Sequence, residues 1–208
     1  MAEGGAGATI EEFAAALASD SPTPGGGSAA AAAVALGAAL VAMSGRLTLA
    51  RKRYRSVHAE MRQIVARADA IRSEALALIE ADAEVYAELL AAYRLPRAPG
   101  AARAEAISAA ALAASRVPAL VGDLALEVID LAHTAVTKAN PHVRSDAAAG
   151  AALARGALRI CEMNIAANIG SVADAGARIK LEHNCERFRD GLARADAAAD
   201  GVLAELRS

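Results

Sequence analysis

The sequence predicts an all-α protein, a single-domain bundle of long antiparallel helices spanning residues 1–208. Strict alternation of apolar and polar residues, the pattern of a strand, occurs nowhere in the chain. Apolar residues instead recur every three or four positions, as they do on one face of a helix. The 208 residues include 61 alanines, two phenylalanines, three tyrosines and no tryptophan. Helices with these side chains are expected to pack closely around one core.

The first helix is predicted to begin at a capping box, in which Thr9 precedes Glu12 by three residues. It ends near Ser19, and residues 1–8 before it are expected to be disordered. The second helix is expected from Ser28 to about residue 49. Ser28 is a suitable N-cap, because its hydroxyl can accept a hydrogen bond from a free N–H group of the first turn.

Proline and glycine delimit the rest of the bundle. Pro118 is expected to kink or split the helix that contains it, since proline removes one backbone hydrogen bond. Ser145 follows Asn140-Pro141 and is predicted to cap the next helix. The four remaining helices are expected at about residues 54–93, 102–139, 145–170 and 178–206.

Charge and composition argue against several classes of partner. A net charge of −2 gives no support for binding nucleic acid. No apolar run is clean enough for a membrane span; residues 29–43 come closest, but Gly37 interrupts them. The N-terminus lacks the pattern of a secretory signal. Cys161 and Cys185 have no partners at metal-binding spacing, so reduced thiols and a cytoplasmic location are expected.

No metal or nucleotide cofactor is expected either. The four histidines show no metal-ligand spacing, and there is no Gly-x-Ser-x-Gly, Walker or dinucleotide-binding pattern. Metals, nucleotides and a serine nucleophile therefore have no support in the sequence.

The first candidate site is the loop before the second helix, where Pro24, Gly25, Gly26, Gly27 and Ser28 follow one another. Glycine allows a ligand to approach the main chain closely, and the N–H groups at a helix start attract anionic or carbonyl-like groups. We therefore predict that these five residues bind substrate. The alternative is a flexible connection between helices.

Asp82 is the candidate catalytic residue. It continues the apolar stripe of the third helix, one turn from Leu78 and Val85. Burial disfavours a charged carboxylate and raises its pKa, and a carboxylic acid that stays protonated near neutral pH can act as a general acid. The alternative is a structural aspartate paired with an arginine of another helix.

Two further sets of residues are predicted to bind substrate. Asp146, Asn164 and Asn168 share one face of the fifth helix, which suggests a polar pocket between helices, or hydrogen bonds that only fix the helix register. The basic run of Arg51, Lys52 and Arg53 follows the second helix. It could hold substrate carboxylates, although such a run is often only a solvated junction.

Taken together, these residues resemble the cyclodeaminase/cyclohydrolase family of folate one-carbon enzymes. The resemblance covers about residues 10–175. Its markers are the residues of segments 24–28, 37–48, 81–86, 92–96 and 117–118, followed by Asn140, Ser145, Asp146, Asn164, Asn168 and Asp174. The chain departs from the family at Ala50 and Ala177, and the segment after Leu181 has no match.

The resemblance implies an all-helical fold, a homodimer or higher assembly, and a folate site between helices and between subunits. A tetrahydrofolate derivative would be the substrate, with no metal. The family's proton donor lies in its Asp-Ala-Glu segment, which corresponds to Asp82 here, and the glycine loop corresponds to its folate-contacting loop.

These features favour a formimidoyltetrahydrofolate cyclodeaminase, which forms 5,10-methenyltetrahydrofolate and ammonia. The alternative is a methenyltetrahydrofolate cyclohydrolase, which forms 10-formyltetrahydrofolate. The Asp-Ala-Glu segment tips the choice towards the first activity, and the lack of an attached formiminotransferase domain towards the second. A helical bundle that binds partners without catalysis is the third reading.

Overall fold

The computed structural model describes residues 5, 7–97 and 101–207, and all regular structure in these residues is helical. The predicted all-α fold is thus confirmed. Most of the start that is expected to be disordered lies outside the described residues, as do residues 98–100 between the third and fourth predicted helices. The elements are α1 (Ile10–Leu17), α2 (Gly26–Leu49), η1 (Lys52–Val57), α3 (His58–Arg94), α4 (Ala102–Lys138), η2 (Pro141–Val143), α5 (Arg144–Ile169) and α6 (Ala175–Arg207).

Two predicted helix caps differ in the structure, and α3 and α6 begin at His58 and Ala175 rather than near residues 54 and 178. The capping box of Thr9 and Glu12 is confirmed, but Ser28 is not the N-cap of α2. That position belongs to Gly25, and Ser28 lies inside the first turn. Ser145 does not cap α5 either, because α5 already begins at Arg144. In both cases the short 3-10 or glycine segment before the helix makes the turn without a side-chain cap.

Helix α4 is continuous through Pro118, so the predicted split is wrong. Proline removes the hydrogen bond that its N–H would donate to the carbonyl of Ala114, four residues earlier. That carbonyl accepts a hydrogen bond from the side-chain amide of Asn168 on α5, at 3.5 Å. A neighbouring helix therefore replaces the lost bond.

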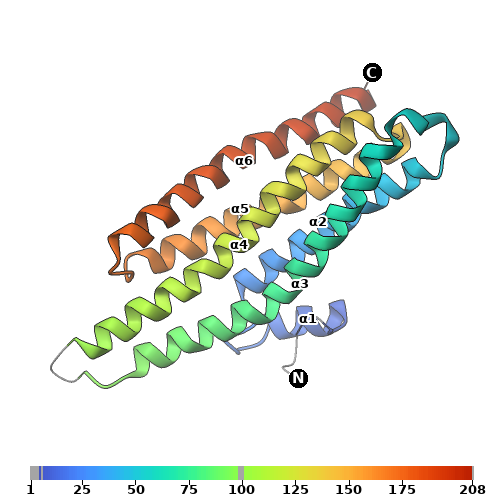
Figure 1. Ribbon diagram of the computed structural model, residues 1–208. Helices are drawn as coiled ribbons and strands as arrows, with labels where there is room; N and C mark the ends of the chain where they lie inside the picture. Colours follow the sequence, from blue (N-terminus) through green and yellow to red (C-terminus); the bar gives the residue numbers. More distant parts are fainter. Residues whose placement is uncertain (1–4, 6, 98–100, 208) are drawn as a thin grey trace.

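Helix α2 packs antiparallel to both α3 and α5, and its outer side is not covered by another long helix (Figure 1). Its contact with α5 centres on Gly37 and Gly150, where backbones touch. A Cβ atom on Gly37 would lie 2.8 Å from the carbonyl oxygen of Gly150. Ridges of alanine and valine fill the remaining contact, which gives the alanine-rich core that the composition predicts.

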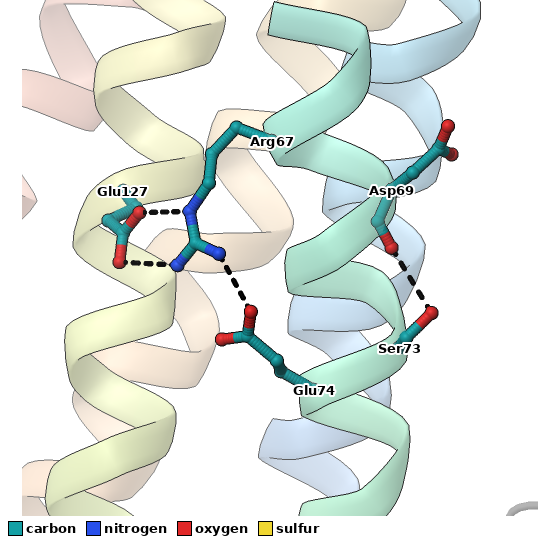
Figure 2. Close-up of polar contacts among 5 residues, drawn as sticks. All are labelled: Arg67, Asp69, Ser73, Glu74 and Glu127. Carbon is teal, nitrogen blue, oxygen red and sulfur yellow. Dashed lines mark hydrogen bonds and ion pairs between the residues drawn. The ribbon is translucent and has the colours of Figure 1, made fainter.

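Ion pairs tie the helices together at the surface. The guanidinium of Arg67 on α3 donates two hydrogen bonds to Glu127 of α4, at 2.7 and 2.9 Å, and a third to Glu74 at 2.7 Å (Figure 2). All three side chains are partly exposed, so this network contributes little to stability but fixes the α3–α4 register.

By length and apolar composition, α2 and α4 could each cross a membrane, with mean hydropathies of 1.8 and 1.4 in their most apolar windows. This corrects the expectation that no segment is apolar enough. Of these windows, 56% in α2 and 61% in α4 is buried inside the bundle. Packing in the core therefore explains part of their apolar composition. The remainder of the apolar surface of α2 is exposed.

Replacing Gly122 with alanine is expected to lower the free energy of unfolding by about 1–3 kcal/mol. A Cβ atom there would lie 2.1 Å from the ring of Phe188, which is fully buried between α4 and α6. Gly156→Ala is the matched control, because no atom lies within 4 Å of its added Cβ. Alanine's better helix propensity should make that variant slightly more stable in the same denaturant titration. Equal free energies of unfolding for the two variants would contradict the close packing of Gly122 against Phe188.

Candidate active site

The glycine loop and Asp82 come together at the start of α2. The Ser28 hydroxyl donates to Oδ2 of Asp82, at 3.0 Å, and also lies 3.2 Å from the carbonyl oxygen of Ile79. Ser28 is fully buried and Asp82 half-buried. The two residues that the sequence selected for different reasons, one in a loop and one on an apolar stripe, are thus direct neighbours.

Gly27 is the residue that lets Asp82 approach. A Cβ atom at this position would lie 2.0 Å from Oδ1 of Asp82 and 2.5 Å from its Cγ. Any other residue would therefore displace the carboxyl group. Gly26 differs, because it is exposed and its added Cβ would make only ordinary contacts with Ile160 and Asn164.

Burial raises the pKa of the Asp82 carboxyl above its ordinary value. Hydrogen bonds from the hydroxyl and backbone N–H of Ser28 act in the opposite direction but do not cancel the effect of burial. Among the described residues, no lysine or arginine forms an ion pair with this carboxyl. The alternative of a structural Asp–Arg pair therefore lacks a partner in the described part of one chain.

The carboxyl of Asp82 is expected to make stability depend on pH. Since its pKa is raised in the folded state, the protonated form favours folding; this stabilisation is complete in acid and lost as the pH rises through the raised pKa. Asp82→Asn, which cannot ionise, should therefore gain stability relative to the unsubstituted protein between acid and neutral pH. Denaturant titrations of both proteins across this range measure the difference. A difference that stays constant with pH would contradict the raised pKa.

Two of the polar residues on α5 lie at the same end of the bundle. The side-chain oxygen of Asn164 would be 3.9 Å from a Cβ on Gly26, so it borders the exposed start of α2. Asn168 is one turn further along and donates to Ala114 of α4. Cys161 is buried close to Asp82, and burial, together with the negative charge of that carboxylate, raises the pKa of its thiol. The thiol is therefore protonated and inert at neutral pH.

Tyr93, which lies in the marker segment 92–96, and Ser171 were not predicted as site residues, and they meet beyond the start of α2. Their hydroxyl groups lie 3.1 Å apart and connect the last turn of α3 with the segment after α5. Both residues lie on helix ends without an apolar stripe that would have marked them.

The basic run lies at the opposite end of α2. Arg51, Lys52 and Arg53 line a depression of about 950 Å³ together with Asn140 and His142. The Tyr54 hydroxyl donates to the side-chain oxygen of Asn140 at 3.1 Å and so joins η1 to η2. Asp146, in the first turn of α5, belongs to this end as well. Three cations around a depression suit an anionic group.

One chain does not bring all predicted substrate-binding residues together. The 24 residues of α2 separate the glycine loop from the basic run by about 35 Å, at about 1.5 Å per residue. Asp146 and Asn164 are 18 residues apart on α5, or about 27 Å on the same basis. Within a single chain, Arg51, Lys52, Arg53 and Asp146 therefore form a second set, distant from Asp82.

Within the described ranges, no group of three or more His, Cys, Asp or Glu side chains is arranged to hold a metal ion. The residues at the α2 start are a carboxyl, a hydroxyl, amides and free backbone N–H groups. Such a set can bind a polar heterocycle and transfer a proton to it.

Comparisons with known proteins identify the family of the chain. The family model for formiminotransferase-cyclodeaminase matches residues 9–187. A methenyltetrahydrofolate cyclohydrolase from Methylorubrum extorquens is 36% identical over 203 aligned positions, and the alignment covers 96% of each chain. Both matches continue past Leu181, so the segment for which the sequence analysis gave no match has counterparts.

Two more distant relatives also match the chain. Formimidoyltransferase-cyclodeaminase from Rattus norvegicus is 30% identical over 90 residues, 43% of this chain and 17% of the rat protein. The crystal structure of a formiminotetrahydrofolate cyclodeaminase from Thermotoga maritima superposes with a TM-score of 0.87 at 21% identity, covering 97% of this chain and 98% of the other. That likeness shows a shared fold. From the family match and the full-length relative, the chain belongs to the formiminotransferase-cyclodeaminase family of enzymes.

Proposed function

We propose that this protein is a methenyltetrahydrofolate cyclohydrolase, which adds water to 5,10-methenyltetrahydrofolate and releases 10-formyltetrahydrofolate. The observation that carries the proposal is the similarity along 96% of both chains to a relative with that name. Relatives named as cyclodeaminases match in sequence over less than half of this chain. The preference for cyclodeaminase that the Asp-Ala-Glu segment suggested is therefore the less supported of the two activities.

The proposed reaction needs one proton delivered to a nitrogen. Water attacks the methenyl carbon between N5 and N10, and the bond from this carbon to N5 then breaks. One hydrogen of the water is lost to solvent, and N5 gains a proton as it leaves. Asp82 is the proposed donor, because its raised pKa keeps the carboxyl protonated closer to neutral pH. The second hydrogen of the water restores the proton of Asp82.

The surrounding groups supply binding and orientation. Free N–H groups of Gly26 and Gly27 at the start of α2 suit the developing oxygen or a pterin carbonyl. Asn164 borders the same surface and can hydrogen-bond the heterocycle. In this proposal Pro24 and Gly25 hold the loop, while Ser28 orients the Asp82 carboxyl rather than touching substrate.

Cyclodeaminase activity is the second candidate, favoured by the partial match to the rat enzyme. In that reaction N10 attacks the amidine carbon of 5-formimidoyltetrahydrofolate, and ammonia leaves. Asp82 would protonate the departing nitrogen, so the same carboxyl serves both reactions. This is the reason that the site alone separates them poorly.

One absorbance experiment distinguishes the candidates. Purified protein is offered 5,10-methenyltetrahydrofolate and, separately, 5-formimidoyltetrahydrofolate, and the near-ultraviolet absorbance of the methenyl form is followed. Enzyme-dependent loss from the first substrate supports the cyclohydrolase proposal, and appearance from the second supports the cyclodeaminase. Turnover of neither substrate by folded protein would leave a non-catalytic bundle and overturn the proposal. Asp82→Asn serves as the inactive control.

A further inference from the structure

The depression between η1 and η2 is lined by the basic run and by one buried amide, Asn140. We propose that Asn140 is an oxyanion-binding residue, whose side-chain N–H groups donate to a carboxylate or phosphate held beside Arg51, Lys52 and Arg53. Tyr54 is the positioning residue that fixes this amide. The proposal rests on the contacts of Asn140 and does not depend on the reaction proposed above.

Asn140 is almost completely buried, with 6% of its surface exposed. Its backbone N–H donates to the Thr48 hydroxyl at 2.9 Å, and its carbonyl accepts from the N–H of Val143 at 3.0 Å. Its side-chain oxygen accepts twice, from the Tyr54 hydroxyl at 3.1 Å and from the backbone N–H of His142 at 3.3 Å. Among the described residues, Nδ2 is the one polar atom of Asn140 that has no hydrogen-bond partner. A donor on a buried side chain is costly to leave unpaired, so water or a ligand is expected to meet it.

The two contacts of the side-chain oxygen also fix the orientation of the amide. A backbone N–H can only donate, so the atom of Asn140 that faces His142 has to be the oxygen. The Tyr54 hydroxyl reaches the same oxygen, and the NH₂ group is therefore the end of the side chain that is left for the depression. Both of its hydrogens are available to the oxygen atoms of an anion.

Buried hydrogen bonds between α2 and η2 hold Asn140 in place. The Thr48 hydroxyl, which accepts from Asn140, donates to the carbonyl of Ser44 at 2.8 Å. The Ser44 hydroxyl in turn donates to the carbonyl of Val143 at 3.0 Å. Both hydroxyl-bearing residues are fully buried. A donor that is already ordered in this way can bind a ligand with little loss of conformational freedom.

The cations around the depression carry uncompensated charge. Arg51, Lys52 and Arg53 are exposed, and within the described ranges none of them forms an ion pair. Lys138, at the end of α4, pairs with Glu60. The described residues that line the depression include no carboxylate. Cations and an amide donor without a neighbouring acid select an anion.

Tyr54 connects the amide to one of these cations. Its hydroxyl holds the side-chain oxygen of Asn140, while its ring carries the guanidinium of Arg53 at 4.6 Å from the ring centroid. One half-buried side chain thus sets the position of two groups that would contact the anion. This double contact is the reason that we assign Tyr54 a positioning role.

Calorimetric titration of the full chain with inorganic phosphate and, separately, with glutarate tests the site without any folate. Asn140→Asp keeps the size of the side chain and the oxygen that accepts from Tyr54 and His142, but it replaces the donor with a negatively charged oxygen. The dissociation constant of the preferred probe is expected to rise about 10–100-fold, the effect of losing hydrogen bonds to a charged group.

The matched control is Asn184→Asp, which makes the same change of charge on α6, where the side-chain oxygen accepts from Arg187. Its dissociation constants should stay close to those of the unsubstituted protein. An unsubstituted protein that binds neither probe would overturn the proposal. Unchanged binding by a folded Asn140→Asp protein would overturn it as well, because the cations alone would then hold the anion.

Tyr54→Phe tests the positioning role. Phenylalanine keeps the ring beneath Arg53 and removes only the bond to Asn140, so the dissociation constant should rise about 2–10-fold. The side-chain amide signals of Asn140 in an NMR spectrum, identified by their absence in Asn140→Asp, should shift when phosphate is added. In Tyr54→Phe these signals should already differ before phosphate is present.

Ser44→Ala is the comparison for a purely structural effect. It removes the buried bond to Val143 without altering a group that faces the depression. The melting temperature should therefore fall while the affinity for phosphate stays the same. If Tyr54→Phe behaves in this way too, with unchanged affinity and unchanged amide signals, the positioning role is wrong.

A kinetic experiment separates the two sources of the anion. A phosphate-dependent rise in the KM for 5,10-methenyltetrahydrofolate at constant kcat, lost in Asn140→Asp, would identify the anion as a carboxylate of the folate. Phosphate binding that leaves KM unchanged would identify a separate ligand that carries an oxyanion, and either result supports the site. Should the protein turn over neither folate, the calorimetry and the amide signals still decide the proposal, because neither measurement requires turnover.

Discussion

Replacing Asp82 with asparagine is expected to lower kcat about 10²–10⁴-fold, the usual contribution of a positioned proton donor. Asparagine keeps the size of the side chain and can still accept the Ser28 hydroxyl bond, which is 3.0 Å long in the structure. It cannot donate a proton to a departing nitrogen. The Michaelis constant should therefore change little, while turnover collapses.

The control for this variant is Glu84→Gln, which removes an exposed carboxylate two residues away on the same helix and should leave kcat unchanged. Steady-state rates and thermal unfolding are measured on both proteins. Nearly full turnover by a folded Asp82→Asn protein would mean that this carboxyl only accepts hydrogen bonds from Ser28 in the first turn of α2. The catalytic assignment would then be wrong.

The second large effect is expected for Gly27→Ala. The added Cβ would lie 2.0 Å from Oδ1 of Asp82, so either the carboxyl or the start of α2 must move. Displacement separates Asp82 from Ser28, and we expect a loss of about 1–3 kcal/mol in unfolding free energy. Turnover should fall as far as in Asp82→Asn, because the proton donor is no longer in position.

A double-mutant cycle isolates the cause. In an Asp82→Ala background the carboxyl is absent, and the stability penalty of Gly27→Ala should largely disappear. Gly26→Ala is the neighbouring control: its Cβ would make a 3.6 Å contact with Ile160, so its melting temperature should stay close to that of the unsubstituted protein. A penalty for Gly27→Ala that persists without the carboxyl would locate the clash elsewhere.

Helical periodicity predicted the bundle and singled out Asp82, because the stripe of apolar residues on a helix indicates which of its faces is buried. It erred by a single position at the preceding turn, where Ile79 rather than Leu78 is buried. The neighbours of Asp82 could not be derived in the same way. That Ser28 donates to it and Gly27 makes room for it depends on how α2 and α3 pack, over a sequence separation of 54 residues.

The remaining differences also arise from contacts between helices. Local rules predicted a kink or a split at Pro118, but α4 is not split, and the amide of Asn168 supplies the missing donor from α5. The shared face of Asp146, Asn164 and Asn168 was predicted correctly as a direction around α5. Because they are separated along the helix axis, Asp146 lies at one end of the bundle and Asn164 and Asn168 lie towards the other. The residues of a helical stripe share a direction around the helix axis, but the stripe does not show how far apart they lie along it.

The Ser28 hydroxyl carries one hydrogen but lies within reach of two acceptors, Oδ2 of Asp82 at 3.0 Å and the carbonyl oxygen of Ile79 at 3.2 Å. An ionised Asp82 attracts this hydrogen more strongly than a neutral carbonyl does. A protonated Asp82 releases it, and the hydroxyl can rotate towards Ile79. Each loss or gain of a proton by Asp82 would therefore be accompanied by a rotation of the buried Ser28 hydroxyl. The hydrogen bond from this hydroxyl to the Ile79 carbonyl of α3 would then depend on whether Asp82 is protonated.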